Sequence, residues 1–443
     1  MDKAIAIRNH ILSLLPGCPE NGRLPSARKL AADFDVSFQF VQRVVDDLAD
    51  RGVIQVFPRS GMSPHPYWKK RQVNGVFKTH ADDFIIRGIQ GCIAKRIPEI
   101  FISREFERAP MEMAVTHYLV SHHRQYCDLR PLLGRVVPEN NMLFSKIVDA
   151  GKFGDNLCGI PLVFSPQVML LNRRIFERCG CELPPEDWTW DDLARTAAEL
   201  ARHIEPYRAL GIWRQLTVWA SFVTVNGSSI VDPDDASLVK LDSPESIQAL
   251  EFFFELLKKH AVPAHLAKEY NHLHDFRAGN TAIILSSRQT LAAMISAGVI
   301  SKEDIVLRQI PVREKGMVSR AMLAANFYCV RKECVDMELA EELLRLLLSD
   351  ECQRDIIGAS GCGFHIMQTP EQQSFNNGDQ HDAVFAKALS NVVPRYNITN
   401  PASYHLVCQG MESILSKSGE GLASEVARLA DALRLISSFG DEE

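Results

Sequence analysis

The stretch that decides the fold is CGIPLVFSPQVMLLNRRIFERCGCELPPEDWTWDDLARTAAEL, which runs from Cys158 to Leu200. Its apolar run QVMLLN has the length and composition of a buried strand, and RRIFERC continues it as a helix. A proline pair then marks a turn, and Trp190 with Asp191 opens a second helix. A strand followed by two helices indicates an α/β unit.

The chain around this stretch is long and ordinary in composition. Its 443 residues exceed what one hydrophobic core usually holds, so two or three domains are expected. Apolar residues make up 46% and charged residues 23%, as in globular proteins. No window approaches the run of about twenty apolar residues that a membrane helix needs. Arg8 and His10 interrupt the apolar core that a signal peptide requires, so we expect a cytoplasmic protein without membrane contact.

The cysteines predict a reduced protein without a metal site. There are eleven, an odd number, and they are scattered without a CxxC pair. This usage fits a reducing compartment better than a disulfide framework. Cys179 and Cys181 lack a second pair at metal-binding spacing, and the sequence HLHD at His272–Asp275 is interpreted as a solvated turn. We therefore expect no metal and no cofactor.

The net charge of −6 is divided unevenly along the chain. Residues 1–72 hold eleven Lys or Arg against seven Asp or Glu, a net charge of +4, so the remainder carries −10. The boundary falls in SPHPYWKKRQ, a stretch with prolines and a basic cluster that is typical of a linker. The small basic part is suited to a polyanion, whereas the large acidic part is not.

Residues Gly22–Pro64 predict two short helices and a hairpin. Ser26 and Ser37 can each cap a helix, and apolar residues follow both at helical spacing. The tight turn between the helices makes them cross steeply, so the start of the second helix projects, as in helices that enter a major groove. VIQVFPRSGM then alternates like a strand and turns, which predicts a wing.

LPSARKLAADFDVS, VQRVVDDLADRGVI and RSG together resemble the winged helix-turn-helix of the GntR family of bacterial repressors. Phe38 stands where that family usually has an arginine. The resemblance implies a DNA-binding domain at residues 1–64, a linker at 65–75, binding to double-stranded operator DNA and a homodimer. The residues that it places at the DNA are Ser26, Arg28, Ser37, Gln39, Gln42, Arg43, Arg59 and Gly61, the last as the shaping residue of the wing.

Some GntR regulators resemble aminotransferases in their C-terminal part, and Lys417 in ILSKSGEG superficially offers a Schiff-base lysine. Only 26 residues follow Lys417, too few for the small domain that such an enzyme places after its lysine. We therefore interpret Lys417 as part of a solvated loop between helices.

The stretch Cys158–Leu200 itself resembles extracellular solute-binding proteins of sugar transporters. The residues that carry the resemblance are Gly159–Pro161, Asn172, Phe176 with Glu177, Gly180, Pro184 with Pro185, and Trp190–Leu193. NGSSIVD, LDSPESIQALEFFFELLKK, FRAGNTAIILSSR and LLRLLLSDECQRDIIGASGCG continue the pattern in order. The resemblance implies a two-lobed α/β domain of periplasmic-binding-protein type at residues 76–443, with a cleft that closes by hinge motion.

A carbohydrate site needs flat aromatic faces for the apolar side of a sugar ring and fixed polar groups for its hydroxyls. Such residue types stand at predicted strand ends and loops of the two-lobed domain. The candidate ligand-binding residues, for a mono- or oligosaccharide, are Trp213, Trp219, Asn226, Arg288, Phe327, Tyr328 and Phe364. Each aromatic residue among them can equally be a core residue. This core interpretation is weakest for the two tryptophans, Trp213 and Trp219.

Taken together, these patterns predict a multidomain transcription regulator: a winged helix-turn-helix followed by a two-lobed domain that senses a carbohydrate and changes operator affinity. No catalytic residues are expected. One alternative is a carbohydrate-acting enzyme, which would need a convergent carboxylate pair that the spacing does not supply. Another is a cytoplasmic sugar-binding protein whose winged helix serves protein contacts. A transport receptor is disfavoured by the expected lack of a signal peptide and by the basic head.

Overall fold

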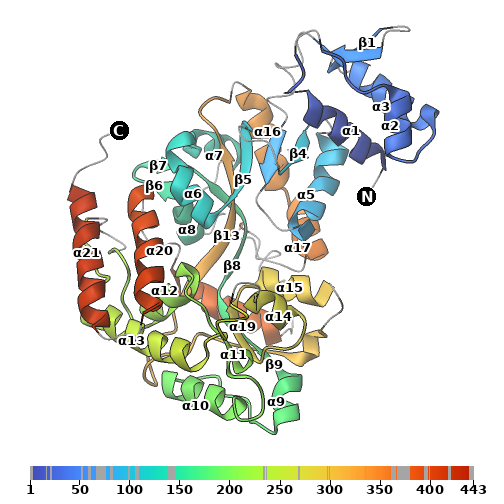
Figure 1. Ribbon diagram of the computed structural model, residues 1–443. Helices are drawn as coiled ribbons and strands as arrows, with labels where there is room; N and C mark the ends of the chain where they lie inside the picture. Colours follow the sequence, from blue (N-terminus) through green and yellow to red (C-terminus); the bar gives the residue numbers. More distant parts are fainter. Residues whose placement is uncertain are drawn as a thin grey trace.

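The computed structural model has an N-terminal unit followed by two lobes (Figure 1). It describes residues 3–438 apart from residues 16, 20–21, 51–52, 58–60, 66–75, 80–82, 98–99, 105–108, 138–144, 233–234, 236, 268–269, 297, 299, 335, 361–365, 367–379, 394–397, 399 and 418–420. The expected linker at 65–75 lies outside these residues except for His65.

In its described residues, the N-terminal unit has three helices and a hairpin: α1 (Lys3–Leu14), α2 (Ala27–Asp33), α3 (Phe38–Asp50), β1 (Ile54–Phe57) and β2 (Gly61–Pro64). The two helices and the hairpin predicted between Gly22 and Pro64 are thus present. Ser26 Oγ accepts a hydrogen bond from the N–H of Lys29, and Ser37 Oγ accepts one from Phe40, each at 3.2 Å. These caps satisfy N–H groups that a helix start leaves unpaired.

The first lobe is built on a sheet with the strand order β14-β13-β5-β3-β4, in which β8 also pairs with β13. Its strands are β3 (Val76–Thr79), β4 (Phe101–Ser103), β5 (Met111–Val115), β8 (Ile160–Pro166), β13 (Ala321–Val330) and β14 (Val392–Val393). Its helices are α5 (Asp83–Arg96), α6 (Thr116–His122), α7 (Arg130–Val136), α8 (Ser145–Val148), α16 (Met337–Leu347) and α17 (Asp350–Ser360), with the short elements η1 (His123–Gln125), η3 (Asp149–Gly151), β6 (Lys152–Phe153) and β7 (Asn156–Leu157).

The second lobe has a smaller sheet with the order β10-β11-β9-β12. Its strands are β9 (Val168–Asn172), β10 (Leu210–Gly211), β11 (Ile283–Ser286) and β12 (Ile305–Arg308). Its helices are α9 (Arg173–Cys179), α10 (Trp190–Leu200), α11 (Pro206–Ala209), α12 (Leu216–Val225), α13 (Pro244–Lys259), α14 (His272–Arg277) and α15 (Arg288–Ser296), with η4 (Lys302–Asp304). The strand and the two helices predicted within Cys158–Leu200 are confirmed as β9, α9 and α10.

The chain passes between the lobes more than once. β8 belongs to the first sheet and β9 to the second, and only Gln167 separates them. The chain returns between β12 and β13. Each lobe has its own apolar core, so the architecture is that of two bodies joined by short connections, as in proteins that close by hinge motion.

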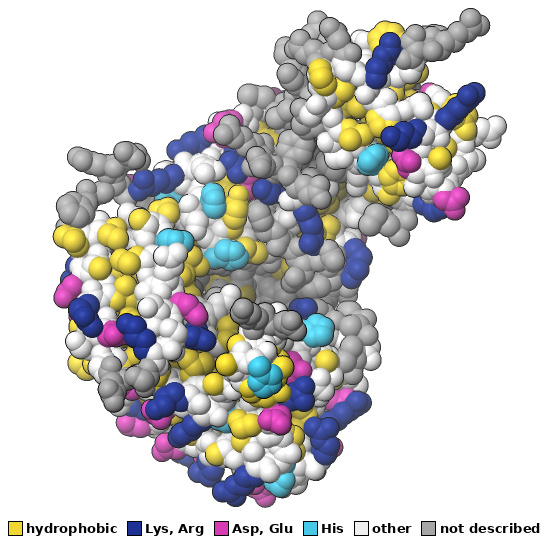
Figure 2. Space-filling view, viewed as in Figure 1, with side chains coloured by type: hydrophobic (Ala, Val, Ile, Leu, Met, Phe, Trp, Pro, Cys, Tyr) yellow, Lys and Arg dark blue, Asp and Glu magenta, His cyan; other side chains and the backbone are white. Residues whose placement is uncertain are grey.

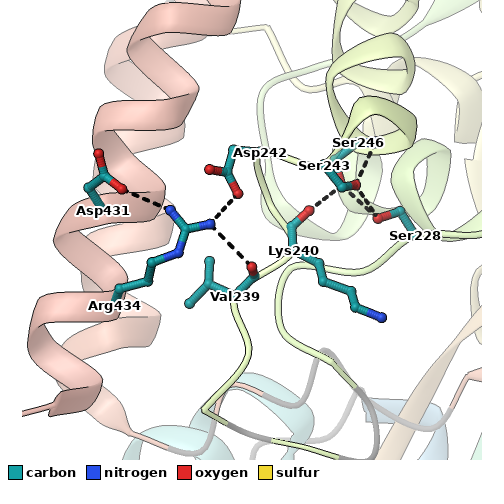
Figure 3. Close-up of polar contacts among 8 residues, drawn as sticks. All are labelled: Ser228, Val239, Lys240, Asp242, Ser243, Ser246, Asp431 and Arg434. Atoms are coloured by element: carbon teal, nitrogen blue, oxygen red, sulfur yellow. Dashed lines mark hydrogen bonds and ion pairs between the residues drawn. The ribbon is translucent and has the colours of Figure 1, made fainter.

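The C-terminal helices α19 (Gln380–Ser390), α20 (Pro401–Leu415) and α21 (Leu422–Ser438) add mainly to the core of the second lobe. Figure 3 shows how α21 is fastened. The guanidinium of Arg434 donates to Asp431 at 2.8 Å, to Asp242 at 2.6 Å and to the carbonyl of Val239 at 3.4 Å. The bond to Asp431 lies within α21, whereas those to Asp242 and Val239 join this helix to the segment just before α13.

The N-terminal unit lies beside the first lobe, near α5, α16 and β4 (Figure 1). Ala109, two residues before β5 begins, is fully buried in the same apolar cluster as Leu30, Val41 and Val45. A residue from the first lobe therefore completes the core of the N-terminal unit, so the two parts share packing as well as a chain connection.

Candidate solute-binding site

The strand ends of the second sheet identify the edge that faces the first lobe. β10 and β11 run parallel, with Gly211 opposite Ile284. Just beyond β11, the backbone N–H of Arg288 donates to Ser165 Oγ in β8 of the first sheet at 3.0 Å. The C-terminal ends of β10 and β11 therefore lie on this side, which we call the interlobe edge. Figure 2 shows the molecule hollowed between the upper and lower lobes.

A pocket with a volume of about 300 Å³ opens next to Trp213, which follows β10 at the interlobe edge. Its described lining comes from the second lobe and from the end of α20, within residues 212–214, 254–272 and 415–417. Four rings stand in the wall: Trp213, Phe254, Tyr270 and His272. An aromatic, concave surface of this size suits a small cyclic ligand.

The aromatic wall is ordered by ring contacts. The rings of Trp213 and His272 stack with centroids 5.2 Å apart and an interplanar angle of 15°. Tyr270 meets His272 edge-on at 4.9 Å, and Tyr207 meets Tyr270 edge-on at 5.0 Å. Gly211 lies beside this wall, and a Cβ there would be tight against Thr281 at 3.2 Å but at ordinary contact distance, 3.5 Å, from His272 Nδ1. Offset and edge-on rings each add packing energy beyond the buried area.

Asp275 holds the base of this wall. It is 8% exposed and accepts hydrogen bonds from the hydroxyl groups of Tyr270 (2.6 Å) and Thr281 (3.0 Å) and from Asn280 Nδ2 (3.3 Å). Arg208 Nε lies 3.3 Å from the same carboxylate. Burial alone would raise the pKa of Asp275, but these donors and the guanidinium outweigh it and hold the pKa below its usual value.

His272 is uncharged at neutral pH. Burial disfavours the imidazolium and lowers the pKa of His272 to about 4, against a smaller opposing effect of Asp275. Burial and the hydrogen bond to Asp275 raise the pKa of Tyr270. Both groups therefore stay neutral at pH 7, so the aromatic wall adds no charge to the pocket.

The structure corrects three of the predicted ligand-binding aromatic residues. Trp219 is 1% exposed within α12, and Phe327 and Tyr328 are fully buried in β13. β13 has neighbours on both sides in the sheet and helices over its faces, so successive side chains are buried on either face. The Tyr328 hydroxyl donates to the carbonyl of Ala340. These three side chains belong to the core and present no face to a ligand.

Asn226 is also a structural residue, because it is 3% exposed and its Nδ2 donates to the carbonyl of Glu245 at 2.8 Å. Arg288 lies at the interlobe edge, where it pairs with Asp382 at 2.6 Å and covers the ring of Phe385. Phe364 lies outside the described residues. Of the predicted set, Trp213 is the half-buried aromatic residue that lines a pocket, and its ligand role stays a prediction, as does that of Arg288.

The motifs NGSSIVD and LDSPES lie together as a structural unit. The hydroxyl groups of Ser228, Ser243 and Ser246 lie within 3.2 Å of one another, and Ser246 donates to the carbonyl of Lys240 (Figure 3). Ser243 also caps α13 by accepting from the N–H of Ser246. These hydroxyl groups are used to fix a loop to a helix start.

Sequence reasoning missed most of the pocket. The expected solvated turn at His272–Asp275 is wrong, since these residues form the start of α14 and both named side chains are 8% exposed. Phe254 and Tyr270 carried no signal of their own. Lys417 does lie just beyond α20, half-exposed as expected for a loop, but it also lines the pocket. Within the described residues, no group of three His, Cys, Asp or Glu side chains is placed to hold a metal ion.

The residues predicted to face DNA are partly engaged within the N-terminal unit. Ser26 and Ser37 cap helices, Gln42 donates to Asp46 at 2.8 Å, and the Arg43 guanidinium covers the ring of Phe40. Gly61 has a φ of +87°, which a wing turn requires. Arg28 and Gln39 lie on α2 and α3, and Arg59 is outside the described residues.

No known family model matches the chain. It is similar to an ABC transporter solute-binding protein of Thermotoga lettingae bound with α-D-tagatose, with 12% identity, a TM-score of 0.68, and 82% of this chain and 98% of that chain covered. An ABC substrate-binding protein of Listeria monocytogenes in complex with cycloalternan gives 16% identity, a TM-score of 0.65 and the same coverage. UgpB from Mycobacterium tuberculosis in complex with glycerophosphocholine gives 13% identity, a TM-score of 0.66 and the same coverage.

The chain thus has the two-lobed α/β fold of solute-binding proteins over about 82% of its length. The expected GntR-type transcription regulator is contradicted, because the solved structures that share this fold include ABC transporter solute- and substrate-binding proteins. None of these comparisons supports DNA binding, an operator or a homodimer. The error came from treating a local pattern of two capped helices and a hairpin as a function. In the described part of the chain, no helix combines the length and hydropathy of a membrane span.

Proposed function

We propose that this protein binds a small carbohydrate or polyol at the interlobe edge of its second lobe and closes the two lobes around it. The observation that carries the proposal is the aromatic pocket beside Trp213 at the strand ends that face the first lobe. The solved structures with this fold include proteins bound with tagatose and ribitol, which supports a polyhydroxylated ligand. Binding energy would come from stacking on Trp213 and from hinge closure.

The matching experiment is a thermal-shift panel of sugars and polyols on the full chain. A ligand at about 100 times its Kd should stabilise the folded state by about 2.7 kcal/mol, which gives a shift of a few degrees in Tm. Trp213→Leu should reduce the shift to about half or less at the same ligand concentration. It should leave the ligand-free Tm nearly unchanged, since the side chain is half-buried. No response to any member of the panel, at concentrations up to tens of millimolar, would overturn the proposal.

The cellular location expected from the sequence stays a prediction. All ten cysteines that the structure describes are unbridged, which suits a reducing compartment. A cytoplasmic solute-binding protein would report or buffer its ligand without a role as an external receptor. Fractionation of the native cells with an antibody against this chain tests the location directly.

A further inference from the structure

Apart from His272, whose buried Nδ1 has no hydrogen-bond partner among the described residues, the uncharged polar side chains described below are already engaged inside the protein. Trp213 Nε1–H donates to Gln215 Oε1 at 2.9 Å, and the hydroxyl group of Tyr270 donates to Asp275 at 2.6 Å. The hydroxyl group of Ser416 donates to the carbonyl of Ser413 at 2.7 Å. A neutral sugar would have to compete with these bonds for its hydroxyl groups, and the lost bonds offset much of what it gains.

Besides the His272 ring, the pocket has donor capacity on cationic side chains. Arg214 precedes α12, Lys258 lies in the last turn of α13, and Lys417 follows α20, so three separate elements bring a positive charge to one cavity. None of its described lining residues is Asp or Glu. Arginine and lysine are donors only, so they match groups that are acceptors only.

The ion pairs that these three side chains make within the protein leave them able to bind a ligand anion. Arg214 lies 3.5 Å from Glu412 and Lys258 lies 3.4 Å from Glu255, both longer than the roughly 2.7–2.9 Å of a strong charge-assisted hydrogen bond. Lys417 pairs with Glu425 at 2.8 Å, but its side chain is 52% exposed and an ammonium has three donors. Exposed pairs of this kind are weak, so a ligand anion can join or replace them.

We propose that the pocket takes an anionic saccharide, with the sugar ring against Trp213 and its carboxylate or phosphate group between Lys258, Lys417 and Arg214. This assignment rests on the solute-binding function proposed above and narrows its ligand class. The ring supplies apolar contact to the aromatic wall, and the anionic group accepts from donors that neutral hydroxyl groups use less well.

The experiment compares matched ligands by calorimetry on the full chain: glucose, glucuronate, glucose 6-phosphate, and inorganic phosphate alone. We expect both anionic sugars to bind at least tenfold more tightly than glucose, and inorganic phosphate to bind weakly because it lacks the ring. Lys417→Gln should weaken the anionic sugars about three- to tenfold and leave glucose within twofold. Raising NaCl from 20 to 500 mM should weaken only the anionic sugars, because salt screens exposed charges.

Lys315→Gln is the matched control, since Lys315 is an exposed lysine paired with Asp187 that does not line the pocket. It should change none of these affinities. Comparing glucuronate with glucose 6-phosphate tells whether the site prefers a carboxylate or a phosphate group. Either preference supports the inference. Glucose or a neutral polyol binding as tightly as its acidic analogue would overturn the inference and leave the solute-binding function standing. If no sugar, neutral or anionic, binds at all, both fail together.

Discussion

Asp275→Asn tests whether the buried carboxylate of Asp275 stabilises the pocket wall. This carboxylate holds the segment that carries Tyr270 and His272. The substitution keeps the shape of the side chain and removes its negative charge. The bonds from Tyr270 and Thr281 then become neutral ones, at a loss of about 1 kcal/mol each, and one amide N–H meets the donor of Asn280. The Arg208 contact is discounted because that side chain is 38% exposed. We expect a loss of about 2–3 kcal/mol in the free energy of unfolding at pH 7.

The pH dependence gives this prediction a sharper form. Since the folded-state pKa of Asp275 lies below its unfolded value, its stabilising contribution is fully present above the unfolded pKa of about 3.9. It is lost as the pH falls through the folded pKa. Urea unfolding at pH 7 and at steps down to about pH 3 should therefore show the difference between the parent and Asp275→Asn shrinking with acid. The control Asp187→Asn, at a 70% exposed carboxylate, should change stability by less than about 0.5 kcal/mol throughout. Equal stability of parent and Asp275→Asn at pH 7 would refute the reasoning.

Three further substitutions test other parts of the structure by urea unfolding. Trp219→Leu should cost about 3 kcal/mol or more, because the side chain is 1% exposed, whereas Trp213→Leu should cost less than about 1 kcal/mol; the reverse order would place the ligand face on the wrong tryptophan. Glu112→Gln should lower the free energy of unfolding by about 3–5 kcal/mol, since Glu112 is fully buried, pairs with Arg331 and accepts from the Tyr126 hydroxyl group. A small effect would mean that Arg331 finds another partner. Arg434→Ala should cost about 1 kcal/mol through the loss of its bonds to Asp242 and Val239, and an unchanged midpoint would show that α21 is held by apolar packing alone.

The second lobe was predictable where the signal is local. QVMLLN and RRIFERC become β9 and α9 because a continuous apolar run followed by a helix with Gly180 at its end leaves little choice. Gly180 takes the left-handed conformation, with φ of 64°, that ends such a helix. Ser26 and Ser37 likewise cap the helices that their positions predicted.

The site was less predictable because its residues are distant in sequence and alike in type to core residues. Trp213 and Trp219 are six positions apart, yet one lines a pocket and the other fills the core, and this depends on where α12 packs. Phe254, His272 and Lys417 meet only through the tertiary fold. Burial is a property of the whole packing, so composition alone could not separate a ligand-facing ring from a structural one.

The proposed site is tested most directly by a calorimetric titration of the full chain and of Trp213→Leu with the sugar or polyol that gives the largest thermal shift. We expect one ligand per chain for the parent protein. For Trp213→Leu we expect a Kd at least tenfold weaker, with the ligand-free Tm of the two proteins nearly equal. Binding of the same strength to Trp213→Leu would contradict the proposed site.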